Sequence, residues 1–191
     1  MVIALDTHSE KNLLKVIHGL LSECSVAIAH NGDKFDFKKL NTRFLHHGLT
    51  PPAPYKTIDT RSVARRFFGF ASNSLNDLAK EFGIGEKVHH EGFPLWKKCM
   101  AGDKAAFKKM KRYNIQDVDL LEKIYLRFLP WIKSHPNVSD GSGCPKCESK
   151  NIQYRGTVTT QAAVYRKFQC NNCRGWGKER KSVASYGLVN A

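Results

Sequence analysis

Two pairs of cysteines constrain the fold of this chain more than any other feature. The sequence has CPKC at 144–147 and CNNC at 170–173, separated by 22 residues. Each pair can place two thiolates on one metal ion, and two pairs complete a tetrahedral site with no open position for catalysis. The gap slightly exceeds the usual spacing, and four unrelated cysteines are the alternative. We expect a structural Zn²⁺ ion bound by Cys144, Cys147, Cys170 and Cys173.

The segments beside the cysteine pairs predict a small β domain. IQYRGTVTT (152–160) and AVYRKFQC (163–170) are rich in β-branched and aromatic residues and predict the two strands of a hairpin. Such a ribbon has too little apolar surface to fold alone, so the metal would provide the folding free energy. The other two cysteines, Cys24 and Cys99, lie far apart, which favours a reducing compartment over a disulfide framework.

The chain is strongly basic, with 31 lysines and arginines against 17 aspartates and glutamates, a net charge of +14. Nucleic acid is the default partner for such a charge, because phosphate contacts release condensed counterions. A merely soluble basic protein is the alternative. No apolar run approaches the roughly 20 residues needed to cross a bilayer, and no signal peptide is recognisable. We therefore expect no membrane partner and a cytoplasmic protein that is not secreted.

Strand and helix patterns alternate along the first part of the chain, which indicates an α/β fold. Apolar spacing predicts helices at 7–24, at 34–47, in RSVARRFF, in SLNDLAKEFG and at about 103–128. Apolar runs predict a strand at 25–30, covered on both faces, and a short strand at 55–59. Residues 84–102 are expected to be rich in loops.

Composition divides the chain into three parts. We expect an α/β domain at 1–133, a polar linker rich in Gly, Ser and Pro at 134–143, and the ribbon with a basic tail at 144–191. The chain begins with an apolar run that ends on Asp6, and a strand that ends on carboxylates can bind metal ions. Thr7 and Glu10 also form a capping box, with Thr7 as N-cap and Glu10 three residues later. We favour this structural interpretation.

Asn31 and Asp36 lie where a polar side chain can serve a binding site. In AHNGDKFD (29–36), an apolar strand ends at Asn31, and Asp36 follows in the first turn of the next helix. An acid in that position is often only a favourable charge at the helix N-terminus. The segment therefore becomes informative only in combination with others.

Tyr113 and Asp117 in YNIQDVDLLEKIY are four residues apart and so share a helix face. That face continues into an apolar stripe. A carboxylate on such a stripe is costly unless it is paired or binds a cation. Asp117 is therefore a candidate ligand, whereas Asp119 points elsewhere and is expected at the surface.

These two segments resemble the second and third motifs of the DEDD 3′–5′ exonucleases, which have an RNase H-like (DnaQ-like) fold. NGDKFD matches Asn-x-x-x-(Phe/Tyr)-Asp, and YNIQD matches the Tyr-x-x-x-Asp of the subclass that carries tyrosine. With its ribbon, the chain is most similar to phage-type exonucleases that join this domain to a C-terminal zinc ribbon. The resemblance would place the protein in a bacterium or a phage-infected host cell.

The resemblance implies two-metal hydrolysis of phosphodiester bonds. Asp36 and Asp117 would be two ligands of a pair of Mg²⁺ or Mn²⁺ ions, which prefer oxygen donors. Tyr113 would orient the attacking water. Asn31 would help to position the motif or the substrate strand.

The chain departs from the family at its beginning. It has no Asp-x-Glu motif, which provides the other two acids of the family. The RNase H-like fold also places three strands, about 50 residues, before its first helix, whereas a helix is expected here directly after Asp6. We therefore expect an incomplete domain that lacks its first strands, with open strand edges and weak catalysis. A truncated reading frame, a separate chain that supplies the strands and a non-catalytic nucleic-acid-binding module are the alternatives.

The ribbon resembles those of transposases and phage nucleases, and its basic residues alternate with aromatic ones. Such a strip suits backbone contact and base stacking, although the aromatic side chains could instead fill the small core. The expected nucleic-acid-binding residues are Arg166, Lys167, Arg174, Trp176, Lys178, Arg180 and Lys181. DNA is preferred to RNA as the partner. A zinc-stabilised protein-interaction scaffold fits the charge less well.

Overall fold

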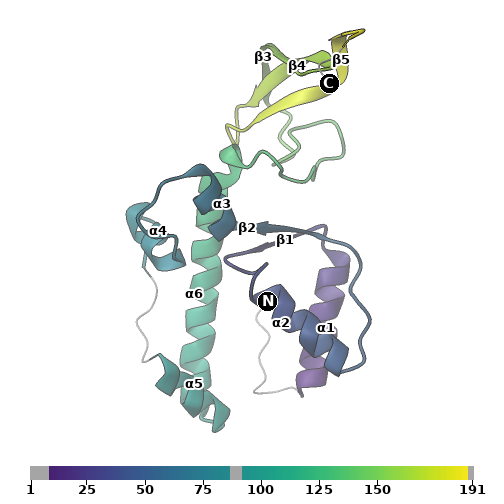
Figure 1. The fold of residues 1–191 in the computed structure, drawn as a ribbon. Helices are drawn as coiled ribbons and strands as arrows, with labels where there is room; N and C mark the ends of the chain where they lie inside the picture. The colour runs from purple at the N-terminus through teal and green to yellow at the C-terminus, as the bar shows by residue number, and fades with distance from the viewer. Residues whose placement is uncertain (1–8, 87–91, 189–191) are drawn as a thin grey trace. The chain divides into compact units, whose positions relative to one another are not determined.

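The computed structural model describes residues 9–86 and 92–188 (Figure 1). The chain divides into two compact units, Met1–Tyr125 and Leu126–Ala191. This division falls inside the long helix α6 (Lys104–Phe128). It therefore lies upstream of the linker expected at 134–143. The division into a domain at 1–133, a linker at 134–143 and a ribbon at 144–191 stays a prediction, because compactness does not show independent folding.

The first unit contains a sheet of two parallel strands. The elements in order are α1 (Glu10–Glu23), β1 (Val26–Ala29), α2 (Asp36–His46), β2 (Lys56–Asp59), α3 (Thr60–Phe67) and α4 (Leu75–Glu81). The segment containing α2 is the crossover connection that a parallel pair of strands requires. In the register of this pair, Ala29 lies opposite Asp59. The strand predicted at 25–30 is confirmed, but its burial on both faces is not. Ile28 is 37% exposed, and β2 is the only strand that pairs with β1 among the described residues.

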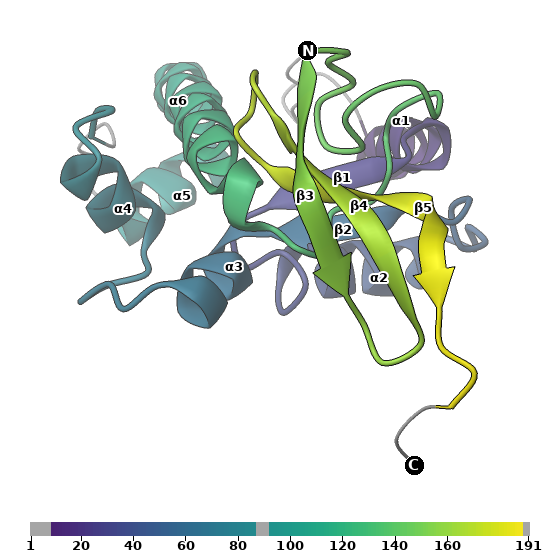
Figure 2. The ribbon, with the colours of Figure 1, turned by 90° about the horizontal axis from the view of Figure 1, so that it is seen from above.

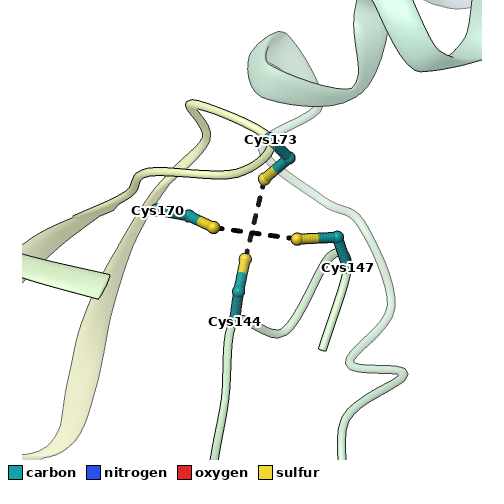
Figure 3. A group of neighbouring side chains, drawn as sticks. All are labelled: Cys144, Cys147, Cys170 and Cys173. Atoms are coloured by element: carbon teal, nitrogen blue, oxygen red, sulfur yellow. Dashed lines mark hydrogen bonds between the residues drawn. The ribbon is translucent and has the colours of Figure 1, made fainter. Parts of the chain in front are cut away.

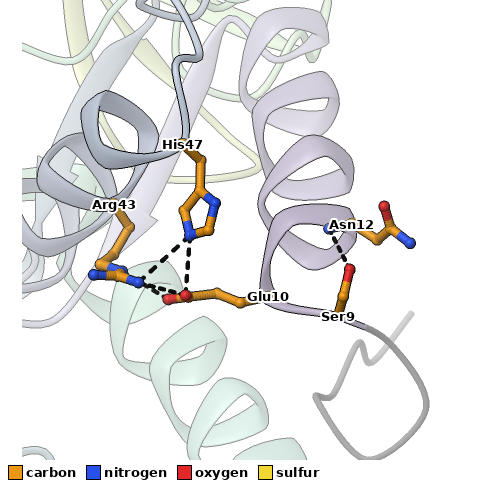
Figure 4. Close-up of polar contacts among 5 residues, drawn as sticks. All are labelled: Ser9, Glu10, Asn12, Arg43 and His47. Atoms are coloured by element: carbon orange, nitrogen blue, oxygen red, sulfur yellow. Dashed lines mark hydrogen bonds and ion pairs between the residues drawn. The ribbon is translucent and has the colours of Figure 1, made fainter.

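The start of α1 differs from the predicted capping box. Ser9 is the N-cap, and its hydroxyl accepts a hydrogen bond from the Asn12 amide at 3.3 Å. Thr7 and Asp6 lie outside the described residues. Glu10 is the first helical residue and pairs with Arg43 of α2 and with His47, the C-cap residue of that helix (Figure 4). Its predicted capping role is therefore wrong, because ion pairing to another helix engages the carboxylate.

The carboxyl group of Glu10 is expected to titrate well below its usual range. Hydrogen bonds from Arg43 and then His47 lower its pKa from 4.5 to about 2. Because the folded-state pKa is the lower one, the stabilisation is present above about pH 4.5 and is lost as the pH falls toward 2. NMR titration of this carboxyl group measures the shift. Arg43→Ala should move the pKa back toward 4.5, and an unchanged pKa would contradict the pairing.

The prediction of a loop-rich segment at 84–102 missed the helix α5 (Phe93–Met100). Residues 87–91 of this segment lie outside the described ranges. Leu95 and Cys99 lie one turn apart on α5 and are buried in a cluster with apolar residues of α6 (Lys104–Phe128). Eight residues carry too short a periodic pattern to separate a helix from a loop. None of the helices in the described ranges is both long and apolar enough to span a bilayer.

The second unit is a three-stranded antiparallel sheet. After the short 3₁₀ turn η1 (Leu129–Trp131) come β3 (Ile152–Thr159), β4 (Ala163–Cys170) and β5 (Trp176–Ser185). β4 lies in the middle of the sheet (Figure 2). The predicted hairpin is confirmed as β3 and β4. The third strand was not predicted, because the alternating charges of β5 hide its strand pattern.

Candidate functional site

The four cysteines of the ribbon meet at one point (Figure 3). Their sulfur atoms lie within 4.8 Å of one another. The Cys144–Cys173 and Cys147–Cys170 sulfur pairs are each 3.7 Å apart. A tetrahedron with metal–sulfur bonds of about 2.3 Å has edges of about 3.8 Å, whereas a disulfide brings two sulfur atoms to about 2.05 Å. The geometry suits one four-coordinate metal ion and excludes four unrelated cysteines.

Two similar turns present these sulfur atoms. Glu148 and Arg174 each follow the second cysteine of a pair, and their φ angles are 59° and 61°. In both turns the amide of the first cysteine donates to the carbonyl five residues later, at 2.9 Å. A β-carbon on Gly175 would lie 3.2 Å from the Cys173 sulfur atom. Arg174, predicted to contact nucleic acid, therefore also shapes a metal-binding turn.

Local surroundings separate the pKa values of the thiols. Burial raises the pKa of Cys144 and raises the pKa of Cys173 to about 12. Burial also opposes ionisation of Cys147, but hydrogen bonds from the Ser149 amide and the Asn172 side chain outweigh it and lower its pKa to about 7. A metal ion binds thiolates, so its affinity for this cluster must fall as the pH is lowered.

Lys146 connects the first cysteine pair to η1, a contact that sequence reasoning missed. Its side chain is buried, and Nζ donates hydrogen bonds to the carbonyls of Leu129 (3.1 Å) and Pro130 (2.9 Å). Burial lowers the pKa of Lys146, while the negative charges of Cys173 and Cys144 in their thiolate forms oppose this shift. The only sequence signal was its position between two metal-binding cysteines.

The basic residues predicted to bind nucleic acid, and Trp176 with them, all lie on or beside β4 and β5. Arg166 and Lys167 are on β4, Trp176, Lys178, Arg180 and Lys181 are on β5, and Arg174 is in the turn between the strands. All are exposed except Lys167, which is half-buried. Phe168 is buried, so for this aromatic residue the alternative of a core role is correct.

A second site candidate lies at the carboxyl ends of β1 and β2, the edge where open α/β sheets bind ligands. Asp59, the last residue of β2, is only 5% exposed. Its Oδ1 accepts hydrogen bonds from the amides of Arg61 (3.0 Å) and Ser62 (3.2 Å), which caps α3. The same carboxylate accepts from the amides of Asn31 (2.9 Å) and Asp33 (3.3 Å). Asp59 thus joins the start of α3 to the loop after β1.

The loop held by Asp59 leads to the predicted metal ligand Asp36. Asn31 has a φ of 71°, and a β-carbon on Gly32 would lie 2.3 Å from that of Ala29, so only glycine fits. Asp36 is exposed in the first turn of α2. Asp59 was missed from the sequence, although an acid between a predicted strand and helix is a recognised N-cap signal.

Tyr113 and Asp117 are half-buried on α6. Tyr113 packs against the buried cluster formed by α5 and α6. Asp117 has a buried carboxylate oxygen, Oδ1, and the stripe continues through buried Leu120 and Ile124. Asp119 is exposed. The predicted placement of these acids relative to the apolar stripe is confirmed.

The structure does not gather the predicted acids into a complete metal site. Within residues 9–86 and 92–188, the four cysteines are the only group of three or more side chains that could hold a metal ion. Asp36 and Asp117 therefore belong to no described cluster of that size. The described residues alone do not fit a two-metal centre, and the absence of the first strands stays a prediction.

The fold and the sites define an α/β protein with a four-cysteine cluster that could hold a metal ion and with polar groups at the carboxyl edge of its parallel strands. Residues 2–129 match the sequence model of the RNase H superfamily, and the chain belongs to this superfamily. It is also similar to Protein NEN3 of Arabidopsis thaliana, with 30% identity over 92 residues, 46% of this chain. The match covers 17% of the length of NEN3.

Proposed function

We propose that the chain provides most of a metal-dependent 3′–5′ exonuclease of the DEDD type. The match of residues 2–129 to the RNase H superfamily is the observation that carries this proposal. The net charge of +14 supports a polyanionic substrate. The substrate is a nucleic acid with a single-stranded 3′ end, DNA in preference to RNA.

Asp36 and Asp117 provide the carboxylate oxygens for Mg²⁺ or Mn²⁺ in this proposal. When bound, such ions stabilise the charge that develops during phosphodiester hydrolysis. The hydroxyl of Tyr113 holds a water molecule, and Asn31 positions the loop or the substrate strand. The left-handed backbone of Asn31 and its hydrogen bond to Asp59 support a positioning role.

Two acids are too few for two divalent ions, so the proposed site requires further ligands. They come from residues outside the described ranges or from a separate chain that adds strands beside β1. The pairing of β1 supports such an addition, because β2 is the only strand paired with it among the described residues. An open strand edge readily pairs with another strand.

The four-cysteine cluster holds a structural Zn²⁺ ion in this proposal. Zn²⁺ favours tetrahedral coordination by thiolates, and the sulfur spacing of 3.7 Å suits it. Four protein ligands leave no position for water or substrate, so the ion stabilises the ribbon and takes no part in hydrolysis.

A cleavage assay with matched variants tests the exonuclease proposal. Zinc-loaded protein and Mg²⁺ are incubated with a single-stranded oligonucleotide labelled at its 3′ end. Slow release of labelled mononucleotides is expected, with a loss of about 100-fold or more in Asp36→Ala and Asp117→Ala. Asp119→Ala changes an exposed acid on the same helix and should retain activity. Full activity of the Asp36 and Asp117 variants would contradict the assigned roles.

A non-catalytic nucleic-acid-binding module is the second candidate function. One observation supports this candidate: the described part of the chain contains no group of three carboxylate or imidazole side chains that could hold a metal ion. This function predicts binding that weakens steeply with salt. It also predicts that no mononucleotide is released at any concentration of Mg²⁺ or Mn²⁺.

A further inference from the structure

The ribbon sheet has two chemically different faces, which the strand register defines. Phe168 in β4 lies opposite Tyr154 in β3 and Gly177 in β5. The rings of Phe168 and Tyr154 meet edge to face, with centroids 6.2 Å apart. A β-carbon on Gly177 would lie 2.3 Å from the Phe168 ring. We call this side, with its buried aromatic residue, the Phe168 face.

Arg166 belongs to the Phe168 face and is engaged by groups of the ribbon itself. Its guanidinium carbon lies 4.1 Å from the centre of the Tyr154 ring. Its Nε is 3.9 Å from Oε2 of Glu179, and the Tyr154 hydroxyl donates to Oε1 of the same glutamate at 2.6 Å. The positive charge of Arg166 is therefore matched within the sheet.

The opposite side, which we call the Trp176 face, carries ammonium groups over aromatic rings. Lys167 lies opposite Lys178, and Gln169 lies opposite Trp176. The Nζ atom of Lys167 is 5.7 Å from the Trp176 ring centre, and that of Lys178 is 3.8 Å from the Tyr165 ring centre. The Trp176 side chain is 49% exposed.

No acidic partner balances the lysines of the Trp176 face among the described ribbon residues. The acids between 144 and 188 are Glu148 and Glu179. Glu148 forms part of the first metal-binding turn, and Glu179 is engaged on the Phe168 face. The Trp176 face therefore combines the exposed ring of Trp176 and the half-buried ring of Tyr165 with positive charge that no described acid of the ribbon balances.

We propose that the Trp176 face binds unpaired nucleotides, with bases stacked on Trp176 and Tyr165 and phosphates held by Lys167 and Lys178. Exposed aromatic rings beside cations suit single strands, because the π-faces of paired bases are covered in a duplex. Gln169, opposite Trp176, is four residues from Tyr165 along β4, about 13 Å at 3.3 Å per residue. The face is therefore long enough for at least two stacked bases, at about 3.4 Å per base.

This inference rests on the proposed nucleic-acid function and names the surface that holds the strand. It also divides the seven residues expected to bind nucleic acid, because Arg166 is assigned to the Phe168 face and to a structural role instead of nucleotide binding. Binding is measured without Mg²⁺, so its outcome does not depend on cleavage.

The first test measures binding of the full zinc-loaded chain to a labelled oligo-dT strand by fluorescence anisotropy. Trp176→Ala is expected to weaken binding about tenfold. Lys167→Gln and Lys178→Gln should each reduce the slope of log affinity against log salt by about 0.7. Arg166→Gln removes the same charge from the other face and should leave the slope unchanged. Zinc content and circular dichroism identify any variant that fails to fold.

Equal slope changes in Arg166→Gln and Lys178→Gln would overturn the proposal, because the charge would then act without regard to face. Equally tight binding of a duplex or of polyglutamate would overturn it as well. A second measurement avoids disruptive substitutions at the face. In a Trp96→Phe, Trp131→Phe background, Trp176 is the only indole, and oligo-dT should quench its fluorescence. Binding without quenching would show that no base stacks on Trp176.

Discussion

Removal of the metal ion from the four-cysteine cluster is expected to unfold the ribbon. The sheet buries few apolar side chains, chiefly Ala163 and Phe168, and one buried aromatic side chain contributes only about 2–3 kcal/mol. Structural Zn²⁺ contributes about 10 kcal/mol or more in small modules of this kind. Chelation should therefore collapse the amide NMR signals of β3, β4 and β5 into the range of an unfolded chain.

Two cysteine substitutions make this expectation specific. Cys170→Ser removes a fully buried ligand and should abolish both zinc binding and the dispersed ribbon signals. Cys24→Ser lies outside the cluster and should preserve both. Zinc content is measured by mass spectrometry in parallel with the NMR spectra. Persistence of the dispersed ribbon signals in metal-free protein would show that the sheet does not depend on the ion.

Asp59→Ala is expected to destabilise the first unit by about 3 kcal/mol or more. The carboxylate accepts hydrogen bonds from four backbone amides and is 5% exposed. Hydrogen bonds to charged groups contribute about 1.5–3 kcal/mol each, and loss of an N-cap costs about 1 kcal/mol. Urea unfolding followed by circular dichroism measures the change. Amide exchange at Asn31 and Asp33 should accelerate, because these amides lose their acceptor.

Two further substitutions separate the role of Asp59 from a general effect of removing an acid. Asp59→Asn keeps the size and one acceptor oxygen, so its effect should be smaller. Asp77→Ala removes an exposed acid of the first turn of α4, whose carboxylate accepts hydrogen bonds from Ser72 and Ser74, and should destabilise the unit less than Asp59→Ala. If Asp59→Ala were no more destabilising than Asp77→Ala, the buried carboxylate would not organise this edge of the sheet.

Long periodic segments were predictable because many residues report the same pattern. The helix predicted at about 103–128 corresponds closely to α6, and the apolar stripe beyond Asp117 is buried as expected. The predicted strands at 25–30 and 55–59 correspond to β1 and β2. In α6, local spacing and burial favour the same structure, so tertiary contacts did not need to override propensity.

Short or charged segments were not predictable, because too few of their residues report a common pattern. α5 has only eight residues, and its two buried positions become meaningful only against α6. β5 alternates charged residues that read as a solvated strip, yet its pairing with β4 makes it a strand. Glu10 fitted a capping box, but ion pairs with Arg43 and His47 engage it. Such contacts join residues far apart in the chain, and no local pattern contains them.

The sequence by itself determined the four-cysteine cluster, because two C-x-x-C pairs with a ribbon between them leave few other arrangements for the thiols. It also determined the alternation of strands and helices and the strongly basic character of the chain. Only the tertiary structure decided that Asp59 holds the loop before Asp36, that Arg166 meets Glu179, and that the ammonium group of Lys167 lies over Trp176. The physical reason is that a carboxylate's partners and a strand's faces are set by pairing across the fold.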